Sequence, residues 1–382
     1  MAKLLDKQRY KCAMGAMQTV QAVSRAIPIL HSGPGCAQKL SDNTGSSGYF
    51  SPNIFPCTSI NEKDVVFGGT KKLHSTIENA LKVIDADLYV VLTGCIPEIV
   101  GDDTGEVVSE FADADKPVIY ASTAGFKGNN YKGHEQIIDA ITDQYLKKSD
   151  HRQKGLVNIW ADVPYQDLFW LGNLRELEKL VQELGLTPNT IFGFDRGIDN
   201  INRIPEAQFN LLVSPWVSVR NMKNMEKKLD IPFLHYPTLP IGAFETGKFL
   251  RTVGRFAGVS DEKIESVINS HENYYYYLIE RYADLFLENR VINKQFSVVA
   301  DVRFETDGYQ IQNQIREHDY HGYPLILGSY YEKELTEDLK GNYLNISWPV
   351  QDKVVLDNHY AGYSGGIRLI EDIYSVAVQR WN

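Results

Sequence analysis

Four cysteines are the residues of this 382-residue chain best suited to metal or redox chemistry. They are Cys12, Cys36, Cys57 and Cys95, so all four fall in the first quarter of the sequence. Free cysteines also pack well in apolar cores, and four buried hydrophobes are the structural alternative. No pair has the C-x-x-C spacing of a zinc ribbon, so the crowding favours another kind of metal or redox site.

Cys36 closes the corner HSGPGC, which begins at His31. Gly33 and Gly35 permit positive φ or close backbone approach, and Pro34 fixes φ. Such a corner can aim a thiolate at a bulky group that lies close to the main chain. On the hexapeptide alone, however, a plain strand-to-helix turn is the favoured interpretation, because glycine and proline commonly mark loops.

Two more cysteines stand at the edges of expected elements. Cys12 precedes a helix of small residues, and Cys95 follows Gly94 at the carboxyl end of an expected parallel strand, where ligand sites of open α/β sheets lie. Together with Cys36 they provide three thiolates, too few for a four-cysteine cluster site. An iron–sulfur cluster shared across a subunit interface would take its other ligands from a partner.

Three further motifs could carry chemistry, but each has a simpler explanation. GAFETGK at 242–248 has P-loop spacing, yet Phe249 stands where Ser or Thr must bind Mg²⁺. GYSGG at 362–366 matches a nucleophile elbow, yet no histidine follows Ser364. GDD at 101–103 could bind a metal or act as acid and base, but we favour a helix N-cap with first-turn charge.

Helices and strands are expected to alternate along the chain. The apolar runs at 86–94 and 116–123 predict buried parallel strands, and the apolar spacing over 70–84 predicts a helix before them. A second series of strands and helices follows the polar segment 149–155, including a helix opened by Asn173. The pattern predicts an α/β fold of parallel sheets with helices on both faces.

We expect three Rossmann-like domains, each a mostly parallel sheet flanked by helices. The first, cluster-binding domain spans 1–150 and ends in the polar segment. The second domain spans 151–292, and a third, smaller domain with a C-terminal helix spans 293–382. This division agrees with a soft prior of roughly 100–200 residues for each domain.

The composition is that of an ordinary globular protein and excludes two classes of function. The formal net charge of −10 argues against nucleic-acid binding and leaves room for a basic protein partner. No apolar run reaches the roughly 20 residues of a membrane span. The charged N-terminus lacks the apolar core of a signal peptide. We therefore expect a cytoplasmic protein that acts away from the membrane.

The three cysteine segments resemble those of the component 1 proteins of nitrogenase and nitrogenase-like reductases, most of all their β-type subunit. These segments are YKCAMGAMQTV, HSGPGC and TGCIPEIVGDD, whose cysteines lie 24 and 59 positions apart. Further similar segments are CTSINEKDVVFGGTKKL, LPIGAFETGKFL and DNHYAGYSGGIRLIEDI. The matches are dense over 10–135 and thinner but collinear to the end.

The resemblance implies that Cys12, Cys36 and Cys95 are the thiolates of an iron–sulfur cluster shared with a partner subunit. Cys57 matches a β-type cysteine that is not a ligand. A P-cluster-like [8Fe-7S] cluster and a simpler [4Fe-4S] cluster both remain open. Glycine amides near the thiols, such as that of Gly94, can donate hydrogen bonds to sulfur and tune the reduction potential.

Two neighbouring residues belong to the same expected site. Phe126, in TAGFKGN, matches a family phenylalanine beside the cluster. Gly125 stands where nitrogenase β chains have a serine that can ligate the P-cluster. This departure puts serine ligation of the nitrogenase kind in doubt.

The resemblance also implies partners and a role. The chain would form a heterotetramer with an α-type subunit and receive electrons from a transiently docking, ATP-hydrolysing iron protein. No cysteine follows Cys95, so no catalytic residue is assigned to this chain, and His359 is not expected to hold a cofactor. An electron-transferring subunit of a nitrogenase-like reductase is the favoured role. A non-catalytic scaffold for cofactor assembly and a tetrapyrrole-reductase subunit are the alternatives.

Overall fold

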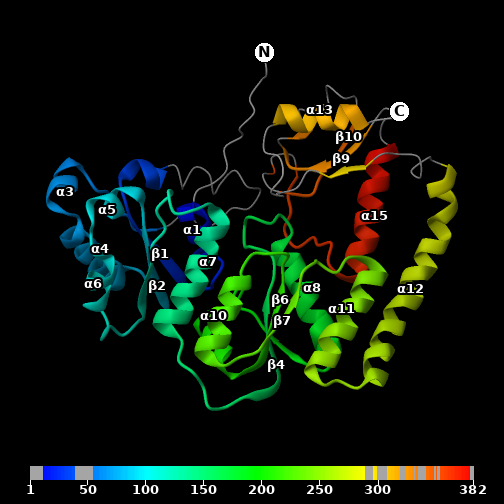
Figure 1. The fold of residues 1–382 in the computed structure, drawn as a ribbon, viewed down its shortest axis with the longest axis horizontal. Coiled ribbons are helices and arrows are strands. Elements are labelled where there is room, and N and C mark those ends of the chain that lie inside the picture. Colours follow the sequence, from blue (N-terminus) through cyan, green and yellow to red (C-terminus); the bar gives the residue numbers. More distant parts are fainter. Residues whose placement is uncertain are drawn as a thin grey trace.

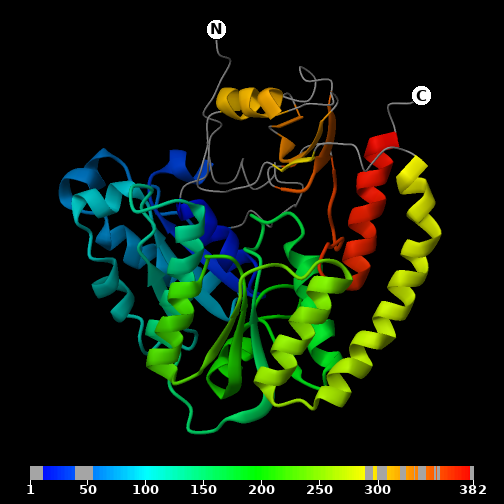
Figure 2. The ribbon, with the colours of Figure 1, turned by 45° about the vertical axis from the view of Figure 1, so that its right-hand side comes forward.

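Three sheets organise the described part of the protein. The computed structural model describes residues 12–38, 55–288, 296–298, 308–318, 324–330, 332–333, 341–347, 350 and 353–378. Within them the strand orders are β1-β2-β3, β5-β4-β6-β7 and β10-β9-β8, and all neighbouring strands run parallel (Figures 1 and 2). The prediction of an α/β fold with three mostly parallel, Rossmann-like sheets flanked by helices is confirmed.

The described elements have the following bounds. The strands are β1 (Ala26–His31), β2 (Leu88–Thr93), β3 (Val118–Ala121), β4 (Gln153–Trp160), β5 (Thr187–Asn189), β6 (Ala207–Val213), β7 (Phe233–Tyr236), β8 (Phe296–Val298), β9 (Leu325–Gly328) and β10 (Asn342–Asn345). The helices are α1 (Cys12–Gln21), α3 (Glu62–Phe67), α4 (Thr70–Val83), α5 (Cys95–Val100), α6 (Thr104–Ser109), α7 (Asn130–Ala140), α8 (Trp170–Glu183), α9 (Ile198–Arg203), α10 (Val219–Leu229), α11 (Gly242–Ala257), α12 (Asp261–Glu288), α13 (Gly308–His318) and α15 (Gly362–Val378), with short turns at η1 (Ile141–Tyr145) and η2 (Ile204–Glu206).

Strand alternation lets the first sheet bury both faces. Tyr89 and Val91 of β2 pack with the apolar side of α4 and α6. The neighbouring residues Val90 and Leu92 belong instead to the core that includes α1 and α7. Successive strand residues point to opposite faces. The whole of β2 is therefore buried, as the continuous apolar run predicts.

Helix α1, which begins at Cys12, packs closely on α7. A Cβ on Gly15 would lie 2.0 Å from the carbonyl oxygen of Asn130, so only glycine allows this approach. One turn further, His134 Nδ1 lies 2.9 Å from Thr19 Oγ1, which donates to the carbonyl of Gly15. Because the Thr19 proton is used in this way, Nδ1 of a neutral His134 carries the ring proton and donates it.

The first and middle sheets share one apolar core. It runs from α1 and α7 of the first sheet to strands β4 and β6 and helices α8 and α11 of the middle sheet. Polar contacts reinforce the joint, since Asn221 Nδ2 of α10 donates to Asp139 Oδ1 and to the carbonyl of Glu135 on α7. The two sheets are therefore packed as one unit.

The third sheet lies above the middle one in Figure 1, and α15 runs up toward it beside α12. A separate apolar cluster joins Leu168 and Phe169, before α8, to Val350, Val355 and Tyr360. The domain boundaries after residues 150 and 292 stay a proposal. The second of them falls outside the described residues.

Membrane insertion has no support among the helices described here. None of them combines the length and the apolar character needed to cross a bilayer.

His134 makes acid stability testable. Its burial lowers its pKa from the usual 6.5 to about 3, so protonation favours the unfolded chain. Stability is then complete above pH 6.5 and is lost as the pH falls toward 3, by up to about 1.4 kcal/mol per pH unit. The variant His134→Gln cannot titrate, so its free energy of unfolding should fall less steeply between pH 6 and pH 4. Urea unfolding at several pH values measures both slopes, and equal slopes would contradict the assignment.

Candidate metal centre

Two of the predicted thiol residues lie at the same edge of the first sheet. Strands β1 and β2 are parallel neighbours with His31 opposite Thr93. Cys36 lies in a short helical turn at 34–38 after β1, and Cys95 is the first residue of α5, two residues beyond the end of β2. Cys36 is exposed and Cys95 is half-buried. The carboxyl edge of the sheet thus presents both loops together.

Cys12 begins α1, and the contact between Gly15 and Asn130 fixes the start of this helix beside the start of α7. The loop that precedes α7 carries Gly125 and Phe126. The backbone around Cys12 is therefore placed near the loop that meets Cys95. The position of the Cys12 thiol itself stays a prediction.

Gly125 contacts the Cys95 thiol through its backbone. Its N–H donates to Cys95 Sγ at 3.1 Å. The next residue, Phe126, is 60% exposed. Glu98, one turn into α5, accepts from Ser122 Oγ at 2.6 Å and so ties this loop to the cysteine helix. A backbone donor, rather than a side-chain oxygen, thus stands at the position where the resemblance leads us to look for a serine.

Gly94 serves close packing. A Cβ there would lie 2.1 Å from Ser32 Oγ, and the N–H of Gly94 donates to the carbonyl of His31 at 2.8 Å. The expectation that this amide is available to a cluster sulfur therefore meets a competing partner within the protein. Ser32 is fully buried, and its hydroxyl has no hydrogen-bond partner among the residues that the structure describes.

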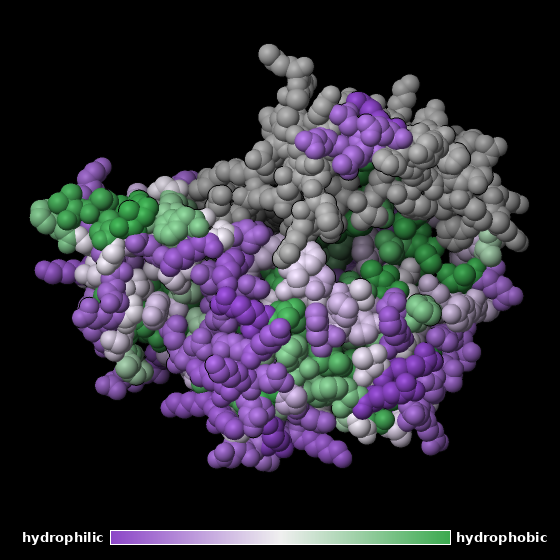
Figure 3. All heavy atoms as spheres, viewed as in Figure 1, coloured by the Kyte–Doolittle hydropathy of each residue, from purple (hydrophilic) through white to green (hydrophobic). Residues whose placement is uncertain are grey.

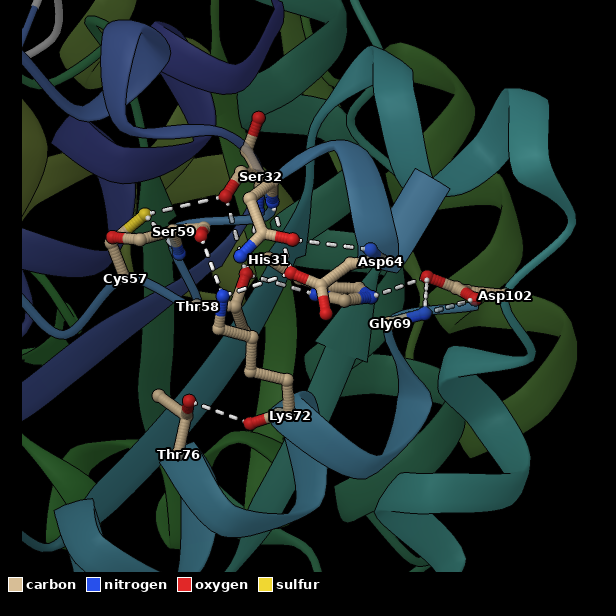
Figure 4. Close-up of polar contacts among 11 residues, drawn as sticks. His31, Ser32, Cys57, Thr58, Ser59, Asp64, Gly69, Lys72, Thr76 and Asp102 are labelled. Atoms are coloured by element: carbon tan, nitrogen blue, oxygen red, sulfur yellow. Dashed lines mark hydrogen bonds and ion pairs between the residues drawn. The ribbon is translucent and has the colours of Figure 1, made fainter. Parts of the chain in front are cut away.

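A buried histidine and aspartate, which the sequence did not single out as a pair, join the cysteine loops. His31 Nε2 lies 3.2 Å from Asp102 Oδ2, and His31 Nδ1 lies 3.1 Å from Thr58 Oγ1 (Figure 4). Asp102 also accepts from the N–H of Gly69. Burial lowers the pKa of His31, against the opposing pull of the Asp102 carboxylate.

The two aspartates of GDD have different structural roles. Asp103 caps α6 by accepting from the N–H of Glu106 at 2.9 Å, as the N-cap interpretation predicts. Asp102 is turned inward, and its side chain is only 4% exposed. Because the two carboxylates have different partners, they do not act together as an acid and a base. Among the described residues, no group of three or more His, Cys, Asp or Glu side chains is arranged to hold a metal ion.

The stretch with P-loop spacing, GAFETGK, forms the start of a helix rather than a loop. Helix α11 begins at Gly242, so the whole of GAFETGK is helical. In a P-loop the glycine-rich residues form a loop that precedes the helix, whereas here the same stretch already forms the first two turns of α11.

Ser364 has a histidine beside it after all, but the geometry excludes a nucleophile. His359 Nε2 lies 3.0 Å from Ser364 Oγ, and Arg368 Nη1 lies 3.0 Å from His359 Nδ1. Because a guanidinium can only donate, Nδ1 must accept and the ring proton is on Nε2. His359 therefore donates to Ser364, which in turn donates to Glu176 Oε1. This histidine cannot take the serine proton.

An apolar surface lies beside the cysteine loops. It consists of Val65, Val66 and Phe67 on α3 and Ile99 on α5, with Phe67 80% and Ile99 74% exposed. Figure 3 shows it as a green patch at the left, over the helices that Figure 1 labels α3 and α5. We call these four residues the α3–α5 face. Neighbouring exposed apolar side chains of this kind mark surfaces that bind other molecules.

Comparison with known proteins gives the family. A family model for nitrogenase component 1 type oxidoreductases matches residues 12–301, so the chain belongs to this family. The molybdenum–iron protein beta chain of Clostridium pasteurianum is 21% identical over 438 residues, which cover 96% of this chain and 92% of that one. Within the family the protein is of the β type.

Other relatives have other roles. The iron–molybdenum cofactor biosynthesis protein NifE of Methanococcus maripaludis is 27% identical over 267 residues, 67% of this chain and 53% of that protein. One subunit of the light-independent protochlorophyllide reductase of Angiopteris evecta is 26% identical over 215 residues, 53% of this chain and 42% of that protein. The solved structure titled nitrogenase Cp1 at pH 6.5 has a TM-score of 0.82 at 18% identity, covering 100% of this chain and 94% of that one, and supports the fold.

Exposure predicts an order of thiol reactivity in the metal-free chain. Cys36 is exposed, whereas Cys57 and Cys95 are half-buried and each accepts a backbone hydrogen bond at sulfur. We expect iodoacetamide to modify Cys36 first, with the order read by peptide mass spectrometry. Denatured chain serves as the control, in which these three cysteines should react at similar rates. Equal rates in the folded chain would mean that the loops do not hold the described geometry.

Proposed function

We propose that this protein is the β-type subunit of a nitrogenase-like reductase. Together with an α-type partner it holds an interfacial iron–sulfur cluster, which relays electrons from an ATP-hydrolysing iron protein to the active site of the partner. The observation that carries the proposal is the meeting of the Cys36 corner, the Cys95 helix and the Gly125 amide at one edge of the first sheet.

Cys12, Cys36 and Cys95 would hold the cluster, which stores and passes single electrons when bound. Two features of the donor set fit such a group. The Cys95 sulfur already accepts a backbone N–H, as cluster thiolates commonly do. The buried Ser32 hydroxyl lacks a partner within the described part of the chain and lies against Gly94, next to that cysteine. This arrangement of residues is compatible with a P-cluster-like [8Fe-7S] cluster and with a [4Fe-4S] cluster.

Gly125 bears on whether a side-chain oxygen can ligate the cluster. It contributes an N–H to the thiol and has no side-chain oxygen. A serine-ligated state of the nitrogenase kind therefore cannot form at this position. The backbone donor instead stabilises negative charge on the sulfur, an effect that raises the reduction potential.

The iron protein would dock on the α3–α5 face. Phe67 and Ile99 are large, exposed and apolar, and α5 begins at Cys95. A partner bound there approaches the cysteine loops without crossing the core. The remaining cluster ligands and the active site would come from the α-type subunit in a heterotetramer. The cytoplasmic location stays a prediction.

A role in cofactor assembly is the second candidate, and similarity to NifE supports it. A tetrapyrrole-reductase subunit is the third, supported by similarity to the protochlorophyllide reductase. The same thiol arrangement serves all three roles. The substrate and the metal of the partner's active site therefore have to come from experiment.

Cluster assembly tests the thiol assignment. In the anaerobically purified complex with its α-type partner, Cys95→Ala should remove the cluster signal in EPR and lower the iron and acid-labile sulfide content. Cys57→Ala, a half-buried cysteine on the same edge, is the matched control and should retain both. Unchanged iron content in Cys95→Ala, with the fold intact by circular dichroism, would contradict the assignment.

Turnover separates the candidate roles. The complex is supplied with iron protein, ATP and a reductant, and N₂, acetylene, methylthio compounds and tetrapyrroles are offered in turn. ATP-dependent reduction of one of these identifies a reductase, which is the expected result. Absence of turnover, combined with transfer of a metal cofactor to an acceptor protein, would instead identify an assembly scaffold.

A further inference from the structure

A buried set of hydrogen bonds connects three segments of the proposed site. Thr58 Oγ1 contacts His31 Nδ1 at 3.1 Å, His31 Nε2 contacts Asp102 Oδ2 at 3.2 Å, and both Asp102 oxygens accept from the N–H of Gly69 at 2.9 and 3.0 Å. We call these four residues the His31–Asp102 network. Figure 4 shows the imidazole between Thr58 and Asp102, with Gly69 beside the carboxylate.

Each end of the network lies next to a functional segment. His31 begins the HSGPGC corner that carries Cys36, and Asp102 follows the end of α5, the helix that begins at Cys95. Gly69 precedes α4 and stands two residues after Phe67 of the α3–α5 face. The network therefore joins chain segments that continue directly into both cysteine loops and into the α3–α5 face.

The glycines of VFGG make room for this contact. A Cβ on Gly69 would lie 2.8 Å from Asp102 Oδ2 and 3.1 Å from His31 Cε1. Gly68 has φ of +87°, a conformation that strains other residues, and a Cβ there would lie 3.2 Å from Asp102 Oδ1. The carboxylate and the turn between α3 and α4 are thus shaped for each other.

The proton positions follow from the donors and acceptors present. Asp102 accepts from Gly69 and can take one more hydrogen from His31 Nε2. Burial lowers the pKa of His31, which favours the neutral ring. With the ring proton on Nε2, Nδ1 competes for the single Thr58 hydroxyl proton with the carbonyl of Ser32, which lies 3.2 Å from Thr58 Oγ1. The network then carries one buried negative charge, at the N-terminal end of α4, whose dipole favours it.

We propose that His31 and Asp102 are positioning residues, which lock the Cys36 corner, the Cys95 helix and the α3–α5 face into one unit. A partner that presses on Phe67 then acts through Gly69 and Asp102 on both thiol loops. The inference rests on the proposed function, because it takes the thiols as cluster ligands and the α3–α5 face as the docking surface. The inference adds His31 and Asp102 to the residues of the proposed function and gives them a positioning role.

Two variants of Asp102 separate its geometry from its charge. Asp102→Ala removes both. Asp102→Asn keeps an acceptor for Gly69, and its amide can donate to His31 Nε2 if the ring proton moves to Nδ1. Asp103→Asn, at the adjacent exposed position, is the matched control, because asparagine caps helices as well as aspartate does.

The first measurement is backbone hydrogen exchange in the complex with the α-type partner. Asp102→Ala should raise the exchange rates of segments 30–38, 68–73 and 94–103 together, by about tenfold, since it removes hydrogen bonds to a charged group. Asp102→Asn and Asp103→Asn should stay close to the parent. Faster exchange confined to the residues around position 102 would overturn the proposal.

The second measurement is the midpoint potential from an EPR-monitored titration. Asp102→Asn should raise the potential, because it removes a buried negative charge, with line shape and iron content unchanged. Asp103→Asn should leave the potential at the parent value. A parent-like potential in Asp102→Asn would count against a buried charge acting at the site.

A folding failure of Asp102→Ala would leave the other end of the network available. Thr58→Val preserves the side-chain volume but removes the hydroxyl that contacts His31. Because this hydroxyl also accepts from the N–H of Ser32 and donates to its carbonyl, exchange in segment 30–38 should rise directly. Faster exchange in segment 68–73 as well is the expected sign of coupling, and faster exchange confined to 30–38 would contradict it. If the parent complex holds no iron, the proposed function fails, whereas the exchange measurements still decide whether the three segments act as a unit.

Discussion

The parallel pairing of β1 and β2 is the constraint on which the rest of the site depends. Because His31 and Thr93 are register partners, the residues that follow them leave the sheet at one edge. One strand continues into the corner of Cys36 and the other into the helix of Cys95. The apolar side chains of β2, buried on both faces, fix this register. Loop residues then only have to refine positions that the sheet has already set.

Much of this could be predicted from the sequence. Apolar runs with helical and strand spacing identify the three parallel sheets, and the glycine-rich corners identify where thiols stand at sheet edges. In the third sheet, β10 has the mixed polar sequence NYLN, in which both asparagines are buried, so its residues show no alternation of apolar and polar side chains that would identify a strand. Residue patterns report burial, and burial dominates regular elements.

Contacts between distant segments could not be predicted in the same way. The sequence predicts that Asn173 opens a helix, yet α8 begins at Trp170, and the Asn173 side chain instead accepts from the N–H groups of Tyr360 and Ala361. The pairing of His31 with Asp102 joins positions 71 residues apart. No local propensity encodes such partners. The hint available was a histidine and an acidic residue placed beside apolar strands, where a polar side chain must find a partner when buried.

The core shared by the first and middle sheets limits how this subunit can move. Helices α1 and α7 share this core with the middle sheet, and a Cβ on Gly15 would meet the backbone of α7. A hinge rotation of one sheet against the other would open that core to water. A response to the proposed redox partner would then consist of small local displacements of loops and side chains. In the proposed electron relay, such rigidity would keep the electron-tunnelling distance nearly constant from one encounter to the next.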